Sequence, residues 1–500
     1  MKLWKKEKVE EKSKRKLEIS ATDVFEYVKC PAFFKQYVNS GKRLEDCYDQ
    51  YYHDIIFQSG KDYELSEMQK LSLIENTQSL ADALRNKTIN TIIKPRMILK
   101  REINVSNKKL KKFKKIYAIG RPDLLIGNKD TNTFIPLDYK TSLGLFKSIC
   151  FQLYHYCYIL QKYDPNIPYL GALKSKKLNT ISFNLNTLTL DWKQIINNII
   201  LIKGGGISER KIVRYDLIWT KECRKCFFHS TCENIVKSNP TINDLPEVGE
   251  RRSQMISDLG IKSREELARK DPKVMWKELL GIQKGKEVFN RELTVKQIIG
   301  TARAFLENEM IILPQKLKPL NIQVNDGFFD LEYISLKTNP VIFSISLGII
   351  KSDGSLSLKN WFANKISDVK KIVSSFYKYL INKGVKRVFG WGIKSGDIPQ
   401  LGKISMLPSE ISFQDLYYDI KNNMAMPVLS YSLKSVSKFL FGNQFQDKIQ
   451  IGLAAIGLYK KFLETGNNEY KESIIEYNKK DVLQTYEIAC WYESLCKEYK

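Results

Sequence analysis

Two short acidic motifs, fifteen residues apart, combine side chains that can hold a divalent metal ion. Asp123 ends the sequence GRPD, and the sequence DYK follows at residues 138–140. Alternate residues of a strand share a face, so Asp138 and Lys140 point together, and Asp123 on a neighbouring strand can join them. Paired carboxylates suit Mg²⁺, and a lysine beside the metal can position the attacking water and stabilise phosphorane charge. The alternative is an ion pair at a strand edge, which is the commoner origin of an Asp-x-Lys pattern.

A second group of acids lies in the last third of the chain. Asp330 and Glu332 share one face of a predicted strand, and Asp397 follows sixty-five residues after Glu332. Tyr477 and Asp481 are four residues apart, which places them on one face of a helix. Four carboxylates can hold two metal ions for in-line phosphoryl displacement, and the tyrosine would orient the attacking water. Surface carboxylates on a degraded domain are the alternative.

Three of the nine cysteines form a tight cluster: Cys223, Cys226 and Cys232. Close thiolates bind zinc or an iron–sulfur cluster. His229 lies among these cysteines and is a possible zinc ligand, so zinc remains an alternative. Spacing alone slightly favours zinc. The cysteines without ligand spacing are predicted to be core residues: Cys47, Cys150, Cys157, Cys490 and Cys496.

The elements that must position these side chains follow from turn signals and apolar spacing. Ser20 and Asp23 predict a capped helix start. In the first half, strands are predicted over 116–126 and 133–139, and helices over 64–86, 145–162 and 191–202. In the second half, strands are predicted over 328–334, 341–350, 357–362 and 385–390, and helices over 368–382, 432–440, 452–464 and 472–496.

The charge of the chain favours a polyanionic partner. Among 500 residues, 81 Lys and Arg against 55 Asp and Glu give a formal net charge of +26, although a lysine-rich proteome gives the same balance. Residues 94–115 hold ten Lys and Arg against one acid, and predict a basic β-ribbon that grips phosphates beside Asp123. The chain lacks a long apolar stretch, a secretory signal and a P-loop, so we expect a cytoplasmic protein that is neither a membrane protein nor a P-loop motor.

The first group of motifs resembles the RecB-like branch of the PD-(D/E)XK nucleases. That family orders a helical Glu, Gly-x-x-Asp, (Asp/Glu)-x-Lys and Gln-x-x-x-Tyr along the chain. The resemblance implies that the acids and the lysine are catalytic, and that the Gln and Tyr organise the site or contact the DNA backbone. Asp138 stands where Glu is commoner, and His53 lies off the spacing of the first motif. The matching residues are Glu64, Asp123, Asp138, Lys140, Gln152 and Tyr156.

The placement of the cysteines resembles that of the iron–sulfur RecB-like nucleases, such as the AddB type. In those proteins one cysteine precedes the nuclease core and three follow it. The resemblance implies a [4Fe–4S] cluster that staples the two ends of the domain, with Zn²⁺ as the alternative; closing so long a loop restricts the unfolded chain. The implied ligands are Cys30, Cys223, Cys226 and Cys232.

The second group of acids resembles the DEDD exonucleases of the DnaQ/RNase H-like fold, in the Tyr-x-x-x-Asp subtype. Asp415-Leu416 and the sequence YSLKSV at 431–436 match the middle section of that family, and the likeness is to the YprB-type domain. The second motif is looser than the family norm, which makes Asp397 the least typical acid. The resemblance implies metal binding by the four acids and a catalytic role for the set Asp330, Glu332, Asp397, Tyr477 and Asp481.

Between the two groups, residues 245–261 resemble a helix–hairpin–helix. Such hairpins point backbone N–H groups at a phosphate. Glu247 stands where the first glycine is usual, and its charge would repel a phosphate. A plain helical linker is therefore an equal alternative.

Together the resemblances imply an α/β multidomain protein with a RecB-like restriction-endonuclease-type core and an Fe–S staple, a helical hairpin linker and an RNase H-like α/β exonuclease fold. The expected parts are a basic arm (1–16), the nuclease domain (17–240), the linker (241–315) and the exonuclease domain (316–500).

The expected function is hydrolysis of DNA phosphodiester bonds with Mg²⁺ or Mn²⁺ in repair or recombination, on single strands or ends, with a 3′–5′ exonuclease-type second domain. The expected partners are nucleic acid, DNA rather than RNA, and a helicase in trans, without a membrane. The alternative is a nucleic-acid-binding subunit of a repair or helicase complex in which one or both nuclease sites are inactive.

Overall fold

The chain divides into two compact units in a computed structural model, Met1–Ile218 and Trp219–Lys500, and each is described by itself. No helix among the described residues is long and apolar enough to cross a membrane. The structure describes residues 15–44, 62–69, 74–75, 92–95, 98–104, 113–128, 132–140, 146–175, 178–205, 207–217, 219–220, 223, 226–282, 288–289, 291–313, 317–335, 339–442, 444–445 and 452–499. The N-terminal arm up to residue 14, Cys47 and His53 therefore lie outside it.

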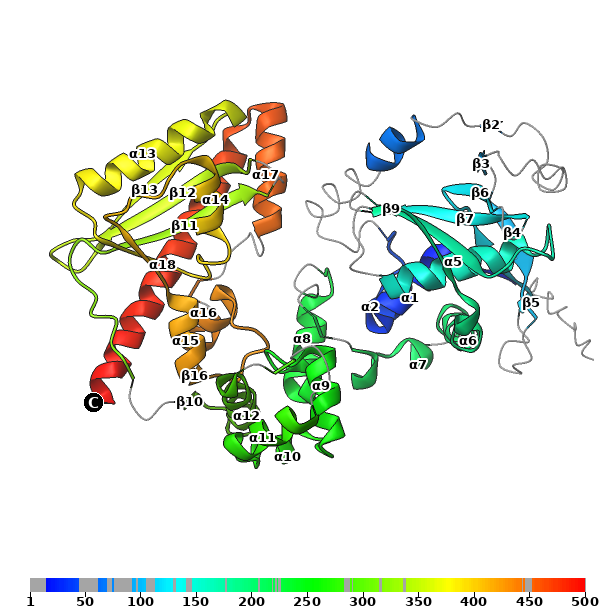
Figure 1. The fold of residues 1–500 in the computed structure, drawn as a ribbon, viewed down its shortest axis with the longest axis horizontal. Coiled ribbons are helices and arrows are strands. Elements are labelled where there is room, and N and C mark those ends of the chain that lie inside the picture. The colour runs from blue at the N-terminus through cyan, green and yellow to red at the C-terminus, as the bar shows by residue number, and fades with distance from the viewer. Residues whose placement is uncertain are drawn as a thin grey trace, which may run out of the picture. The chain divides into compact units, whose positions relative to one another are not determined.

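The first unit contains a six-stranded mixed sheet with the order β2-β3-β6-β7-β8-β9 (Figure 1). Its central pair, β6 and β7, is antiparallel, and β7 runs parallel to β8. Every residue of β7 except the last, Lys140, is buried, which fits the apolar sequence of this strand. The strands are β2 (Ile74–Glu75), β3 (Ile92–Lys94), β6 (Leu124–Asn128), β7 (Thr133–Lys140), β8 (Leu170–Ser175) and β9 (Leu178–Asn184).

A smaller sheet of β1 (Arg15–Ser20), β5 (Phe113–Gly120) and β4 (Leu99–Glu102) completes the unit. Helix α5 (Phe146–Leu160) contacts strands of both sheets and is buried on almost all sides. His155 on α5 is fully buried with Nε2 3.2 Å from the Ile19 carbonyl, and burial lowers its pKa to about 4, so it is a neutral core residue. The described residues of this unit also form helices α1 (Ala21–Lys29), α2 (Pro31–Ser40), α6 (Thr189–Gly204) and α7 (Ile207–Arg210), and residues 62–68 are helical.

Two sequence predictions in this unit were wrong. The strand predicted over 116–126 is two strands in different sheets, β5 and β6, because the chain turns at residues 121–123, where Pro122 has no N–H to donate. The helix predicted over 64–86 is helical at residues 62–68, but Ile74–Glu75 form β2. The capped helix start is confirmed, since Ser20 and Asp23 form a reciprocal capping box on α1.

Near the start of the second unit, the helices between residues 249 and 307 share one apolar core. Glu247 adopts a positive φ of 69° in the predicted hairpin, a backbone conformation that favours glycine. Its carboxylate pairs with Arg252 at 3.4 Å and with Lys421 of α15 (Leu416–Asn423) at 2.7 Å, so its charge is neutralised inside the protein. The helices are α8 (His229–Ser238), α9 (Gly249–Asp258), α10 (Arg264–Ala268), α11 (Pro272–Ile282) and α12 (Glu292–Glu307).

The rest of this unit is built on a five-stranded sheet with the order β13-β12-β11-β14-β15. Strands β11, β12 and β13 are antiparallel neighbours, whereas β14 and β15 run parallel to β11. The strands are β11 (Gly327–Ile334), β12 (Val341–Ile350), β13 (Leu356–Phe362), β14 (Arg387–Gly390) and β15 (Ser412–Asp415), and β10 (Ile311–Ile312) pairs separately with β16 (Met424–Ala425). The helices are α13 (Val369–Asn382), α14 (Asp397–Ile404), α15 (Leu416–Asn423), α16 (Leu433–Phe441), α17 (Gly452–Thr465) and α18 (Asn468–Glu498).

Helices α18 and α13 cover opposite faces of this sheet (Figure 1). Phe328 of β11 meets Tyr486 of α18 with ring centroids 5.2 Å apart, whereas its neighbour Phe329 meets Phe376 of α13 at 5.9 Å. Asp330 and Glu332 lie two and four residues after Phe328 on the same strand. Their side chains therefore point to the same side of the sheet as Phe328 and face α18.

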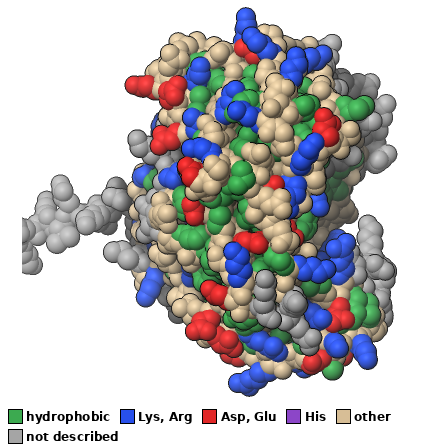
Figure 2. Space-filling model, turned by 90° about the vertical axis from the view of Figure 1, so that its left-hand side faces the viewer, with side chains coloured by type: hydrophobic (Ala, Val, Ile, Leu, Met, Phe, Trp, Pro, Cys, Tyr) green, Lys and Arg blue, Asp and Glu red, His purple; other side chains and the backbone are tan. Residues whose placement is uncertain are grey.

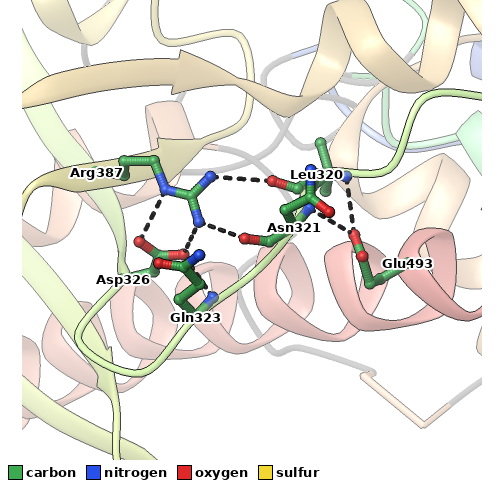
Figure 3. Close-up of polar contacts among 6 residues, drawn as sticks. All are labelled: Leu320, Asn321, Gln323, Asp326, Arg387 and Glu493. Atoms are coloured by element: carbon green, nitrogen blue, oxygen red, sulfur yellow. Dashed lines mark hydrogen bonds and ion pairs between the residues drawn. The ribbon is translucent and has the colours of Figure 1, made fainter.

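Arg387 fixes the segment that leads into β11 (Figure 3). Its guanidinium donates to both carboxylate oxygens of Asp326, at 3.0 and 2.5 Å, and to the carbonyls of Leu320 and Asn321. Glu493 of α18 accepts from the backbone N–H groups of Leu320 and Asn321 at 2.8 and 3.0 Å. The segment that leads into β11 ends at Asp326, four residues before Asp330, and is thus tied to both β14 and α18.

Candidate active sites

Asp123 and Asp138 lie next to each other at one end of the β6–β7 pair. Leu124 pairs with Leu137, so the register places Asp123 opposite Asp138. Asp123 Oδ2 also accepts a hydrogen bond from the Tyr139 N–H at 2.8 Å, which holds its carboxylate against β7. The GRPD turn thus supplies an acid at the start of one strand to an acid near the end of its neighbour.

Burial and mutual repulsion disfavour the charged forms of these two acids. Burial first, and then the charge of Asp138, raises the pKa of Asp123 to about 8. Asp138 is 1% exposed, and Lys140 Nζ lies 3.2 Å from its Oδ2, whereas its Oδ1 has no hydrogen-bond partner among the described residues. Burial acts to lower the pKa of Lys140, but the negative charges of Asp138 and Asp123 outweigh it and raise the pKa, so the ammonium stays charged. A buried carboxylate oxygen without a hydrogen-bond donor fits a divalent cation.

The remaining predicted residues of the first unit gather around these acids. Glu64 is helical and half-buried, and its charge acts on both Asp123 and Lys140. Gln152 Nε2 lies 3.5 Å from the Tyr156 hydroxyl. Burial, and then the charges of Asp138 and Asp123, raises the pKa of Tyr156 well above its usual value, so it remains a neutral phenol. All six predicted residues are therefore brought together, while their catalytic roles stay predictions.

Gly120 makes the approach of Tyr156 possible. A Cβ atom at this position would lie 2.8 Å from Tyr156 Cε1, closer than side-chain atoms pack. The glycine of the Gly-x-x-Asp pattern thus has a local steric reason beside any catalytic one.

The cysteine prediction involves both units. Cys223, Cys226 and Cys232 lie in the second unit, where the Cys226 N–H donates to the Cys223 carbonyl at 3.1 Å. His229 Nδ1 contacts the Cys223 carbonyl at 3.1 Å and its Nε2 lies 3.6 Å from Glu233, so both ring nitrogens have protein partners. Cys30 belongs to the first unit, where its Sγ accepts from the Phe33 N–H at 3.4 Å, and the four-cysteine site stays a prediction.

The cysteines predicted to be core residues are mostly buried. Cys150, Cys157 and Cys496 are buried and Cys490 is half-buried. Burial is the first cause that raises the pKa of the Cys150 thiol, to about 11.

In the second unit, β11 and α18 bring three carboxylates together. Asp330, Glu332 and Asp481 each offer an oxygen within 4.8 Å of those of the other two. Glu332 and Asp481 are 7% and 6% exposed and Asp330 is half-buried, so the group is largely withdrawn from bulk water. The i, i+2 spacing on a strand and a single acid on a helix across it produce this convergence.

Asp397 joins these acids from the first residue of α14. Burial, and then the charges of Asp481 and Asp397, raises the pKa of Asp330 and of Glu332 well above the usual values. Burial also raises the pKa of Asp397 to about 8. Protons or metal ions must offset this much buried negative charge, and a donor set made only of oxygens suits Mg²⁺ or Mn²⁺.

The comparisons with known proteins bear on this unit. Residues 327–493 match the model of the RNase H superfamily. This part of the chain is therefore similar to an RNase H-like domain. No curated protein matches the chain. Among solved structures, the family B DNA polymerase from the hyperthermophilic archaeon Pyrobaculum calidifontis aligns with 11% identity and a TM-score of 0.25, over 46% of this chain and 34% of that one.

Tyr477 lies beside the acids of the RNase H-like domain. It is 6% exposed, and burial, followed by the charge of Asp481, raises its pKa well above the usual value. The phenol therefore keeps its proton and can donate a hydrogen bond near the carboxylates. The five predicted residues of this domain are thus brought together.

Asn478 is a residue of the RNase H-like domain that the sequence reasoning missed. It is fully buried, donates to Asp330 Oδ2 at 2.7 Å, and accepts from Ser344 Oγ at 2.9 Å. Asn360 in turn donates to Ser344 Oγ and Ser346 Oγ, both at 2.8 Å. Two buried serines in the otherwise apolar strand β12 were the available signal.

Asp415 is the second missed residue, and it shapes the loop before Asp397. Its carboxylate accepts from the N–H groups of Gly392 and Lys394 at 2.8 and 2.9 Å, and from that of Tyr417 at 3.2 Å. The sequence pattern marked Asp415 only as part of a family-like segment. Its position at the end of β15, capping α15, gives it this structural role.

Proposed function

We propose that this chain is a metal-dependent nuclease that hydrolyses phosphodiester bonds of nucleic acid, DNA rather than RNA. The main support is the largely buried group of Asp330, Glu332 and Asp481, in a domain that matches the RNase H superfamily. The charge of Asp397 also acts on this group. Divalent metal ions bound there would supply Lewis-acid stabilisation of the phosphoryl oxygens and a nucleophilic water.

The side chains of this domain have distinct tasks in such a reaction. The four carboxylates would hold the metal ions, and Asn478 fixes the orientation of Asp330. The Tyr477 phenol would donate a hydrogen bond that orients the attacking water, because its raised pKa keeps it protonated. By resemblance, this domain acts as a 3′–5′ exonuclease.

The first unit is proposed to hold a second nuclease site of the PD-(D/E)XK type. Asp123, Asp138 and Glu64 would bind a metal ion, and Lys140 would position water and stabilise phosphorane charge. The buried Oδ1 of Asp138, which has no hydrogen-bond partner among the described residues, supports this proposal.

The electrostatics of the basic segment qualify its proposed contact with DNA. In its described part, Lys100 pairs with Glu18 at 3.6 Å, Lys115 pairs with Glu102 at 3.3 Å, and Arg101 stacks on Tyr158 at 4.1 Å. Exposed pairs of this kind are weak and can be exchanged for phosphate contacts. Figure 2 draws a face of the second unit and not the basic segment; on that face, Lys and Arg side chains are dispersed among acids rather than gathered in one patch.

The cysteines are proposed to bind a [4Fe–4S] cluster as a structural staple. Protein partners at both ring nitrogens of His229 favour ligation by thiolates alone over a zinc site that uses this histidine. Anaerobic purification followed by iron, sulfide and zinc analysis tests the assignment. Full occupancy by zinc in protein never exposed to oxygen would overturn it.

The nuclease assignment is tested by metal-dependent cleavage of single-stranded DNA, duplex DNA and RNA. Asp330→Asn and Lys140→Ala should each remove part of the activity without loss of folding. Asp353→Asn in an exposed turn and Lys193→Ala on the exposed face of α6 make the same chemical changes away from both sites and should leave cleavage intact. If the wild-type protein binds nucleic acid but cleaves no substrate with Mg²⁺ or Mn²⁺, it is a binding subunit instead. Roles in DNA repair and beside a helicase follow from the family resemblance alone.

A further inference from the structure

Lys434 is a cation at the edge of the acid group of the RNase H-like domain. It lies in the first turn of α16, a helix that packs on α18. Its Nζ lies 4.2 Å from the centre of the Tyr477 ring, so it stands beside the phenol that faces Asp481. Its positive charge also acts on Glu332, where it opposes the rise in pKa. A cation is therefore placed at the site but on a different helix from its acids.

Rigid contacts hold the segment that carries this lysine. The Tyr431 hydroxyl donates to the Met424 carbonyl at 2.9 Å and accepts from the Met426 N–H at 3.1 Å, and the Tyr431 carbonyl accepts from Trp391 Nε1 at 3.1 Å. Ser432 caps α16 by accepting from the Ser435 N–H at 3.3 Å. A site group held by packed, capped structure is pre-organised for binding.

Charge balance indicates what the lysine would bind. Four carboxylates neutralise two divalent cations, so the scissile phosphodiester, with one negative charge that grows during attack, needs a further cation. We propose that Lys434 binds the scissile phosphate of a nucleic-acid strand and stabilises the charge that develops on it. This inference rests on the proposed nuclease function of the domain. In the reaction, the water oxygen bonds to phosphorus, the bond to the 3′ oxygen breaks, and one proton of the water ends on that oxygen; Lys434 transfers no proton.

The test compares Lys434→Met, Lys434→Gln and Lys434→Arg in the full chain carrying Lys140→Ala, so that cleavage by the first unit does not obscure the result. Lys378→Met is the matched control, because Lys378 is exposed on α13, on the opposite face of the sheet. Binding of a single-stranded oligonucleotide is measured with Ca²⁺ over a range of salt concentrations, and single-turnover cleavage is measured with Mn²⁺. Thermal unfolding checks that each variant is folded.

Log affinity falls as log salt rises, and we expect both uncharged variants to make this fall less steep. The magnitude of the slope should decrease by about 0.7, the value for one lost phosphate contact on a single strand. Their cleavage rate should fall by about 100-fold, as when one charge-stabilising group is removed. Lys434→Arg should keep the slope, and the control should change neither quantity. If a folded uncharged variant keeps the slope and the rate while the parent protein cleaves, Lys434 does not bind the phosphate. If the parent protein neither binds nor cleaves, the proposed function fails as well.

Discussion

Asn478 provides a quantitative test of how the RNase H-like domain prepares its carboxylates. Its amide donates to Asp330 Oδ2 at 2.7 Å inside the protein, and this hydrogen bond opposes the rise in the pKa of Asp330. Hydrogen bonds to charged groups contribute about 1.5–3 kcal/mol. Asn478→Leu keeps the volume but removes the bond, so Asp330 holds its proton more tightly. A tenfold change in affinity corresponds to about 1.4 kcal/mol of binding free energy. The loss of this hydrogen bond should therefore lower metal affinity about 10- to 100-fold.

Calorimetric titration with Mn²⁺ at several pH values measures this effect. The loss should be largest at low pH, where protons compete with the metal for Asp330, and should shrink as pH rises. Asn467→Ala is the control, because Asn467 caps the same helix by accepting from the Glu469 N–H at 2.9 Å. It should cost about 1 kcal/mol of stability without changing metal affinity. Wild-type affinity in Asn478→Leu at every pH would refute the reasoning.

Three further predictions concern stability. Asp123 and Asp397, whose pKa values burial raises to about 8, stabilise the metal-free fold below their unfolded pKa of about 4, and this stability is lost as pH rises to about 8. The melting temperature of EDTA-treated protein should therefore fall between about pH 5 and 8, and an increase there would contradict the raised pKa values. Gly120→Ala should displace Tyr156 and lower the free energy of unfolding in urea by about 1–3 kcal/mol. An unchanged value would show that the backbone and Tyr156 shift to accommodate the methyl group without cost. Arg387→Ala leaves the Asp326 carboxylate without its cationic partner and should lower the free energy of unfolding by about 3 kcal/mol in the same assay. A decrease below about 0.5 kcal/mol would show that the ion pair contributes little to stability.

The second unit was the more predictable from sequence, for physical reasons. Strand β12 matches its predicted bounds of 341–350 because ten consecutive buried residues give a long apolar signal. Asp330 and Glu332 were found because their spacing encodes a shared strand face. Asn478 was missed because its role depends on Ser344 of β12, a partner 134 residues away that local patterns do not contain.

In the first unit, the motif spacing placed the acids correctly although the elements were partly wrong. Asp123 was expected at the end of a long strand and instead follows a turn between two sheets. The register of β6 and β7 still brings it opposite Asp138, since pairing and not strand length sets this contact. At the hairpin, the charge of Glu247 was recognised as unusual, but its pairing with Lys421 depends on tertiary structure.

The central claim is that the carboxylates of the RNase H-like domain form a metal-dependent hydrolytic site. The most direct measurement is nucleotide release from labelled single-stranded DNA by the Lys140→Ala protein, with and without Asp330→Asn, in the presence of Mn²⁺. We predict that the Lys140→Ala protein cleaves and that adding Asp330→Asn abolishes cleavage while the protein stays folded. Equal cleavage by the two proteins, or none by either, would contradict the claim.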